Sequence, residues 1–316
     1  MQVQAEQRPG FISRFFGGLG RGLAALRRWA LNLITLLILI ALVVWLVKSF
    51  FGAETEFLQD KTALVLDLKG ALVEERSAPN NSLLSLAGDS ELKTDVQLRD
   101  LLTVLQTAAD DPRITRILLK LDAFEGGGLA SLREAGAALK RFEVSGKPVI
   151  AWSTNYTQAQ YFLAAHADEV LLDPAGGLML DGLGGNNSYY AEALDKFGIK
   201  VHVVRTGPYK NMAEQFTDKA PSAATLESSS YLLDDLWALM TDEIEQVRKL
   251  PKGKIMQLIN ALPAPLEAAG GDLAKMSLDQ GLVTGLKTIQ QVRDEFIKAG
   301  AQDTENHTFR QVGFDA

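Results

Sequence analysis

The chain of 316 residues is long enough for one large domain or two small ones, and its 47% hydrophobic and 22% charged residues suit a globular body with a full core. A net charge of −7 disfavours nucleic acid as the main partner, because phosphate binding needs a basic face. The absence of cysteine excludes disulfides, thiolate zinc sites and a cysteine nucleophile. Three histidines far apart in the sequence disfavour a histidine metal site and leave few candidates for a Ser-His-Asp triad: His166, His202 and His307. No metal and no cofactor are predicted.

The segment from Trp29 to Val47 has nineteen residues and no charge. As a helix it would be roughly 28 Å long, about the thickness of the hydrocarbon core of a bilayer. Trp29 and Trp45 lie near its two ends, where indole rings favour the membrane interface. The positive-inside rule places the N-terminus in the cytoplasm, because arginines precede the segment and glutamates follow it: Arg14, Arg21, Arg27, Arg28, Glu54 and Glu56. The segment is predicted to be a transmembrane anchor.

A cleaved signal peptide is the competing interpretation of this segment. The segment is longer than the usual apolar core of a signal peptide, and Gly52 and Ala53 follow two bulky phenylalanines, which makes a poor cleavage site. We therefore expect an uncleaved anchor and four parts along the chain. These are a basic cytoplasmic N-terminus (1–28), the anchor (29–47), a tether (48–60) and a single domain on the far side of the membrane (61–316).

Segments typical of strands and helices alternate beyond the tether, with turns that contain Gly or Pro between them. The predicted strands are Thr62–Leu68, Thr115–Leu121, Val149–Trp152, Glu169–Leu172 and Ile199–Arg205. The predicted helices are one capped by Asp95 that ends near Ala109, then Leu129–Val144, Thr157–His166, Ser188–Phe197 and Ala223–Lys249, with smaller helices from about Gly253. Residues Ser77–Ser90, rich in Ser, Asn, Pro and Gly, are expected to form a loop. The alternation predicts an α/β domain with a largely parallel sheet.

Two glycine- or lysine-bearing turns are candidates for chemistry. Gly126, Gly127 and Gly128 open a helix after a strand, where backbone N–H groups can cradle a phosphate or an oxyanion; a plain flexible turn is the alternative. The pattern of a nucleotide-binding loop is absent, since no Gly-Lys-Ser/Thr follows. Lys210 lies just past a predicted strand, between Tyr209 and Met212. A lysine can act as a general base where burial among apolar groups disfavours the ammonium form; the alternative is a solvated loop lysine.

Hydroxyl groups also occur near the end of the predicted strand Val149–Trp152. Ser153 and Thr157 could each be nominated as a nucleophile, but helix capping is the commoner role of such residues, and Thr157 is placed to cap the following helix. His166 lies at the end of that helix, where a buried or capping histidine is the ordinary interpretation. None of these residues identifies a reaction by itself.

In combination, the motifs resemble the signal peptide peptidases. The similarity covers nearly the whole chain: a short basic N-terminus and one anchor, then SGKPVIAW, NYTQAQYFLAAHADEVLLDPAG, KVHVVR, GPYKNMAEQF and GGDLAKMSLDQGLVTGL. The chain looks like the N-terminal half of the long, two-repeat form (protease IV). The resemblance implies a ClpP/crotonase-like spiral of ββα units, a bacterial inner-membrane location with the body in the periplasm, and a Ser-Lys dyad that degrades cleaved signal peptides.

The resemblance assigns the general base to Lys210, with Gly207, Tyr209, Glu214 and Phe216 matching the pattern around it. After the lysine, this pattern usually has small residues and then Glu-Pro-Phe, whereas Asn211, Met212 and Gln215 intervene here. The nucleophilic serine belongs to the second repeat, and the corresponding place here falls at about Gln158, whose amide cannot serve. Gly126, Gly127, Gly128 and Tyr209 are the candidate substrate-binding residues.

The resemblance also implies a ring of four chains, with each dyad completed between adjacent repeats. An isolated half is then expected to assemble poorly and to expose apolar surface, and a second repeat is expected past Ala316. Two alternatives stay open. One is a non-catalytic membrane-tethered module that binds peptide or forms a scaffold. The other is an acyl-thioester enzyme of the crotonase type, which the anchor disfavours because coenzyme A chemistry is cytoplasmic.

Overall fold

The computed structural model describes residues 27, 29, 31–46, 58–76 and 95–314. It divides into two compact units, Met1–Phe57 and Leu58–Ala316. In the first unit, residues 31–46 are helical and every large apolar side chain among them is exposed. None of the helices in the described ranges is both long enough and apolar enough to cross a bilayer. Almost all of the predicted cytoplasmic N-terminus, most of the tether and the predicted loop Ser77–Ser90 lie outside the described residues.

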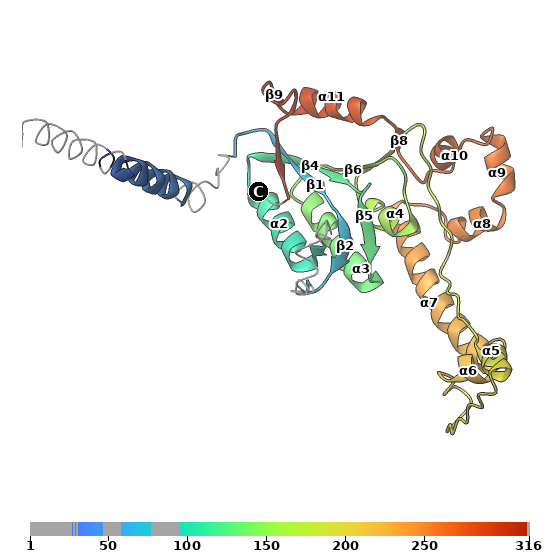
Figure 1. The fold of residues 1–316 in the computed structure, drawn as a ribbon. Helices are drawn as coiled ribbons and strands as arrows, with labels where there is room; N and C mark the ends of the chain where they lie inside the picture. Colours follow the sequence, from blue (N-terminus) through green and yellow to red (C-terminus); the bar gives the residue numbers. More distant parts are fainter. Residues whose placement is uncertain (1–26, 28, 30, 47–57, 77–94, 315–316) are drawn as a thin grey trace, which may run out of the picture. The chain divides into compact units, whose positions relative to one another are not determined.

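A parallel sheet of six strands forms the centre of the second unit (Figure 1). Its order is β11-β1-β4-β6-β7-β8, with β1 at Thr62–Asp67, β4 at Ile114–Lys120, β6 at Val149–Ser153, β7 at Glu169–Leu172, β8 at Gly285–Leu286 and β11 at Gln311–Gly313. The register pairs Ile117 with Val149 and Ala151 with Val170. The central strands are apolar on both faces, as parallel strands covered by helices usually are. The predicted parallel sheet is confirmed.

Helices cover the sheet on both faces. Successive side chains of each strand point to opposite sides, and both sets are apolar, so each face needs a cover. Leu64, Leu66 and Ile117 share one core with α2 (Leu98–Asp110), α3 (Leu129–Glu143), α4 (Gln158–Ala164) and α7 (Ala223–Val247). Ala63, Leu118 and Trp152 point the other way, into a second core with Val292 and Phe296 of α11 (Ile289–Ala299). The hairpin of β9 (Gln302–Asp303) and β10 (Thr308–Phe309) closes this second core.

A smaller parallel sheet, β3-β2-β5, lies beside the large one. It contains β2 (Gly70–Val73), β3 (Val96–Gln97) and β5 (Phe124–Gly127). The chain therefore passes twice from a strand of the large sheet to the small sheet and then into a helix. The predicted capping role of Asp95 is wrong: α2 starts after Gln97, and the Asp95 carboxylate instead accepts a hydrogen bond of 3.1 Å from Ala71 N–H. Asp95 joins two strands because Val96 and Gln97 pair with β2.

The predicted strand Ile199–Arg205 is wrong, although its neighbours are close to their predicted bounds. Residues 199–205 carry no regular structure and are exposed, with Val204 fully exposed. A strand needs a neighbour to bind its backbone N–H and C=O groups, and the described part of the chain places none beside this segment. The apolar pattern is present in the sequence, but a strand forms only where a neighbouring strand is available, and the described residues supply none here.

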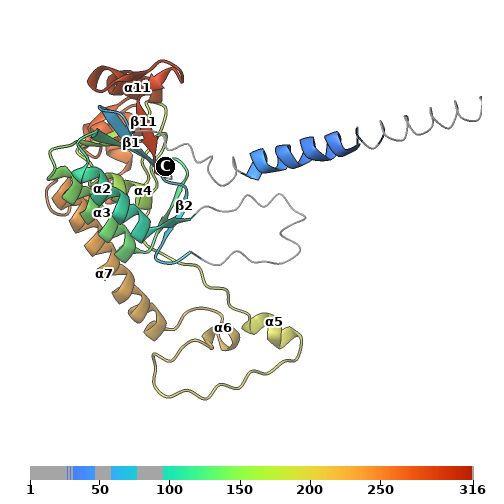
Figure 2. The same ribbon diagram turned by 90° about the vertical axis from the view of Figure 1, so that its left-hand side faces the viewer.

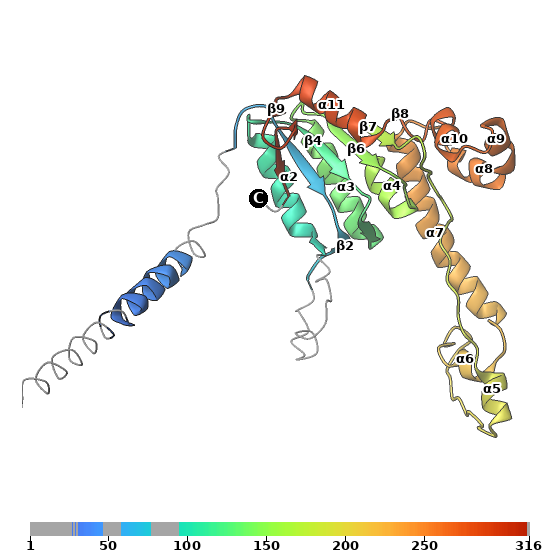
Figure 3. The ribbon, with the colours of Figure 1, turned by 45° about the horizontal axis from the view of Figure 1, so that its top comes forward.

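The region between the sheet and α7, residues 188–222, is here called the arm. It contains α5 (Ala191–Lys196) and the short α6 (Glu214–Thr217). Figures 2 and 3 show α5 and α6 at the end of α7 that is farthest from the sheet. The chain returns along α7 to a group of short helices beside β8: α8 (Lys254–Asn260), α9 (Pro263–Ala268) and α10 (Leu273–Asp279).

Candidate active site

Lys210 lies in the arm, in the loop that leads into α6. Its backbone N–H donates to Gly207 O at 3.4 Å, and Gly207 has a φ of 95°, a left-handed conformation that favours glycine. The Lys210 side chain is exposed, and in the described ranges its ammonium group makes neither a hydrogen bond nor an ion pair. A lysine accepts a proton only in its neutral form, which burial favours. This chain alone does not bury Lys210, so a covering partner would have to do so.

Tyr209, the candidate substrate-binding residue next to Lys210, is bound to α7. Its hydroxyl donates to Glu227 Oε2 at 3.0 Å, and this hydrogen bond raises the pKa of Tyr209. The hydroxyl is therefore already occupied within the chain, while the ring is about half exposed. A stacked pair of rings, Tyr190 and Phe216, joins α5 to α6 with centroids 6.1 Å apart. These contacts give the exposed arm a defined local structure.

The three consecutive glycines have different reasons for being glycine. Gly126 and Gly127 belong to β5, and Gly128 precedes the first residue of α3. A Cβ on Gly126 would lie 2.8 Å from Ala159 Cβ, and one on Gly127 would lie 2.8 Å from Leu72 O. A Cβ on Gly128 would meet no atom within 4 Å. Packing therefore explains the first two glycines, and Gly128 alone leaves open space at the N-terminus of a long helix.

The structure does not bring the glycine turn and Lys210 together. β5 and α3 lie against the sheet, whereas α6 lies at the far end of α7 (Figure 3). A catalytic site that used both regions would have to be completed between chains or between repeats. The prediction that both contribute to one site stays a prediction.

The hydroxyl groups near the end of β6 are structural. Ser153 is fully buried, and its hydroxyl donates to Asn155 O at 2.6 Å. Thr157 caps α4 in a capping box with Gln160, which confirms the predicted cap. Gln158 donates to Gly182 O at 3.0 Å and accepts from Asp181 N–H at 3.3 Å. Its amide holds the start of the segment that leads to the arm.

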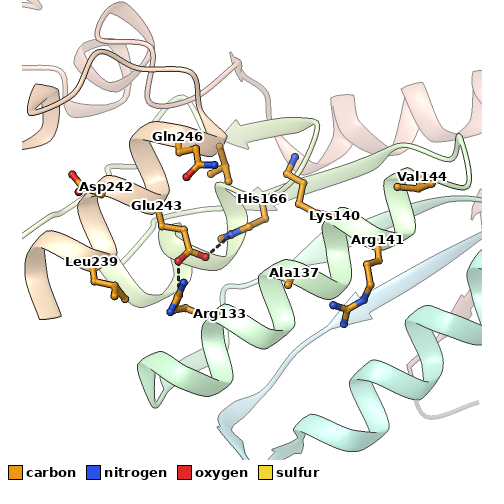
Figure 4. A pocket seen from close by; sticks show the side chains of 11 residues that line it. Arg133, Ala137, Lys140, Arg141, Val144, His166, Leu239, Asp242, Glu243 and Gln246 are labelled. Carbon is orange, nitrogen blue, oxygen red and sulfur yellow. Dashed lines mark hydrogen bonds and ion pairs between the residues drawn. The ribbon is translucent and has the colours of Figure 1, made fainter.

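His166 is buried, as predicted, and lies just after α4, where it lines a cleft of about 700 Å³ between α3 and α7 (Figure 4). One ring nitrogen, Nδ1, bonds to Phe162 O at 2.9 Å, and the other, Nε2, lies 3.2 Å from Glu243 Oε1. The second oxygen of Glu243 accepts a hydrogen bond of 2.6 Å from Arg133. Burial lowers the pKa of His166 against the opposing effect of these two hydrogen bonds.

The side chains that line this described cleft include no hydroxyl group. With no nucleophile beside it, His166 ties α4 to α7 and does not form a hydrolytic triad. In the described ranges, no three His, Asp or Glu side chains converge to hold a metal ion. Lys210 therefore remains the leading candidate for chemistry in this chain.

Comparison with known proteins decides the family. The sequence pattern of peptidase family S49 matches residues 141–301, slightly more than half of the chain. The chain belongs to peptidase family S49. The S49 region includes Lys210 and Gln158, and it leaves out Gly126, Gly127 and Gly128.

Two relatives of this S49 chain are named Protease 4. The chain is 33% identical to Protease 4 of Salmonella typhi over 311 residues, which cover 96% of this chain and 50% of that protein. It is 32% identical to Protease 4 of Haemophilus influenzae over 269 residues, which cover 84% of this chain and 44% of that protein. The resemblance to protease IV is thereby confirmed, and the chain spans about half the length of these relatives.

A solved structure that is similar to this S49 chain is that of the 1510-N membrane-bound stomatin-specific protease. The two are 12% identical, with a TM-score of 0.39, over 75% of this chain and 84% of the other.

Proposed function

We propose that this chain is the general-base half of a membrane-bound Ser-Lys peptidase that degrades cleaved signal peptides. The observation that carries the proposal is the S49 match, which includes Lys210 in a chain that spans about half of its Protease 4 relatives. The exposure of Lys210 supports it, because a base that serves another repeat must be accessible from outside its own chain. We further propose that the ββα order reflects a ClpP/crotonase-like spiral.

In the proposed reaction, the Lys210 amine takes the proton from a serine hydroxyl that the second repeat supplies. The serine oxygen attacks the peptide carbonyl, and backbone N–H groups stabilise the resulting oxyanion. Lysine then returns the proton to the leaving amine, and water hydrolyses the acyl-enzyme in a second passage through the same steps. The open N-terminus of α3 at Gly128 is the candidate oxyanion or peptide contact within this chain.

We propose that the arm is covered in a ring-shaped homotetramer. Its apolar side chains are exposed in the single chain, which is unfavourable in water: Phe197, Ile199, Val201, Val203, Val204 and Met212. Residues 199–205 have the composition of a strand. A strand from an adjacent repeat or chain could cover their apolar side chains and bind their backbone N–H and C=O groups. The same cover would desolvate Lys210.

We propose that residues 29–47 anchor the chain in the bacterial inner membrane, with the N-terminus in the cytoplasm and the body in the periplasm. The described helix at 31–46 supports this, because its apolar side chains are exposed all round. The test is to fuse alkaline phosphatase, which is active only in the periplasm, after residue 60 and to extract membranes at alkaline pH. Active phosphatase that stays in the membrane is expected; an inactive fusion, or one extracted as a soluble protein, would refute the topology.

The competing function is a non-catalytic tethered module. This alternative is supported because, within the described ranges, no serine or threonine hydroxyl is hydrogen-bonded to the Lys210 amine. The deciding experiment measures hydrolysis of casein and of a synthetic signal peptide. It compares the intact gene product, which here means the proposed protein with both repeats, with the 316-residue chain alone. We expect hydrolysis by the intact product and none by the isolated chain. No hydrolysis by either would favour the module, and hydrolysis by the isolated chain would show that the nucleophile lies within these residues.

A further inference from the structure

The loop that carries Lys210 is fastened to α7 on both sides of the lysine. Before it, Tyr209 donates to Glu227 at 3.0 Å. After it, Asn211 Nδ2 donates to Thr225 Oγ1 at 2.5 Å. Both partners lie in the first two turns of α7, which begins at Ala223. Among the described residues, the Lys210 side chain has no hydrogen bond or ion pair, whereas the residues on either side of it are bound to one helix.

A buried carboxylate completes the second attachment. Glu214 is only 4% exposed, although most of the arm around it is open to solvent. Its Oε2 accepts a hydrogen bond of 2.5 Å from Thr225 Oγ1, so that hydrogen bonds run from Asn211 to Thr225 and on to Glu214. Thr225 N–H also donates to the capping residue Ser222 at 3.3 Å. The hydroxyl groups of Ser222 and Thr225 lower the pKa of Glu214, which is therefore ionised at neutral pH.

Burying a charge costs free energy unless its hydrogen bonds are satisfied. At Glu214 they are satisfied by hydroxyl groups at the start of α7, which ties the start of α6 to the start of α7. Its backbone N–H also donates to Asn211 O at 2.9 Å, which closes the turn directly after Lys210. Charge-assisted bonds of this kind are among the stronger hydrogen bonds in proteins. The position of the lysine backbone thus depends on Glu214 and Thr225.

We propose that Glu214 is a positioning residue, which acts through Thr225 and Asn211 to hold Lys210 where a nucleophile from another repeat can meet it. The inference rests on the proposed function of Lys210 and adds the residues that fix its place. A base must lie within hydrogen-bond reach of the proton that it takes, and a misplacement of about 1 Å can reduce a rate about a hundredfold. Without such an attachment, a lysine in an exposed loop would have no fixed position.

The test compares two substitutions of Thr225 in the intact gene product. Thr225→Val has nearly the same shape but removes the hydroxyl that links Asn211 to Glu214, whereas Thr225→Ser retains it. We expect Thr225→Val and Glu214→Gln to lower kcat for peptide cleavage by at least about tenfold with KM little changed. Thr225→Ser should recover most of the rate. Glu192→Gln, in the same arm but away from this network, is the control and should leave kcat unchanged.

Lys210→Ala, measured alongside, distinguishes a failure of the proposed function from a failure of the positioning role alone. If Lys210→Ala retains activity, the proposed function fails. If Lys210→Ala is inactive but Thr225→Val and Glu214→Gln keep wild-type kcat, the positioning role alone is overturned. Amide hydrogen exchange in the 316-residue chain provides a readout that needs no catalysis. Faster exchange at 207–214 in Thr225→Val, with the sheet unchanged, is expected; unchanged exchange at 207–214 would also overturn the proposal.

Discussion

Gly136 of α3 lies against the imidazole ring of His166, so closely that a Cβ at this position would be 2.6 Å from His166 Cε1. The ring cannot easily retreat, because it is buried and bonded to Phe162 and Glu243. Gly136→Ala gains about 1 kcal/mol of helix propensity but must displace a packed ring, which costs about 1–3 kcal/mol. We expect a net loss of about 1 kcal/mol in the free energy of unfolding, measured in urea. Gly185→Ala, with nothing within 4 Å, is the control; a Gly136→Ala variant as stable as this control would contradict the packing described.

Gly127, the last residue of β5, and Gly128, the next residue, should respond differently to alanine. At Gly127 a Cβ would lie 2.8 Å from the backbone oxygen of Leu72, so Gly127→Ala should separate β5 from β2 and lower the stability by about 1–3 kcal/mol. Gly128→Ala meets open space at an ordinary backbone conformation. The loss of glycine at the N-cap of α3 opposes the lower entropy of the unfolded alanine chain, so the stability should change by less than about 1 kcal/mol. A melting curve of each variant gives the comparison. If Gly128→Ala nevertheless reduced peptide cleavage in the intact product, a substrate contact at this helix end would be supported; equal loss of stability in both variants would refute the distinction.

Asp111 provides a prediction for acid stability. Hydrogen bonds from Arg113 lower the pKa of Asp111 from 3.8 to about 2. Because the folded pKa is the lower one, the stabilisation is complete above pH 4 and is lost as the pH falls toward 2. Asp111→Asn should therefore be less stable than wild type at pH 7, and the difference should shrink below pH 4. Urea unfolding between pH 3 and pH 7 measures this. Asp110→Asn is the control, and a difference for Asp111→Asn that did not depend on pH would contradict the assignment.

The α/β architecture was predictable because its parallel strands are buried on both faces and give short apolar runs, such as Val149–Trp152. The same pattern does not predict the structure at Ile199–Arg205, where the apolar run is present but no neighbouring strand lies among the described residues. The predicted helix cap at Asp95 is wrong for a related reason. Its sequence context suits a cap, but Val96 and Gln97 pair with β2, so α2 begins two residues after the expected place. Composition and local pattern do not show which partner a segment finds.

The candidate site divides in the same way. Lys210 was predicted from its place after an apolar segment and from the family resemblance. The role of Thr225 is not predictable from the sequence, because its hydrogen bond to Glu214 joins two helices, and no periodic pattern indicates such a contact. The signal that could have suggested it is the capping sequence that begins at Ser222, whose third helical residue is Thr225.

The apolar surface of the arm can be tested with two exposed valines. Val204 in the arm is 100% exposed and Val144 at the end of α3 is 88% exposed, so an aspartate at either position should leave the fold of the single chain intact. If the arm is covered in the proposed tetramer, Val204→Asp should shift the intact product to smaller species than Val144→Asp gives, because burying a charge is costly. Val144→Asp should leave the assembly unchanged. Sedimentation in detergent measures the shift, and identical assembly of both variants would refute a covered arm.

The proposed peptidase activity depends most on Lys210 as its general base. The direct measurement is hydrolysis of casein by the intact gene product carrying Lys210→Ala or Lys210→Arg, with Lys298→Ala, another exposed lysine, as the control. Both substitutions at Lys210 should abolish hydrolysis and leave the assembly unchanged, since alanine has no base and a guanidinium does not release its proton at working pH. Lys298→Ala should cleave casein at the wild-type rate. Hydrolysis at the wild-type rate by either Lys210 variant would contradict the account.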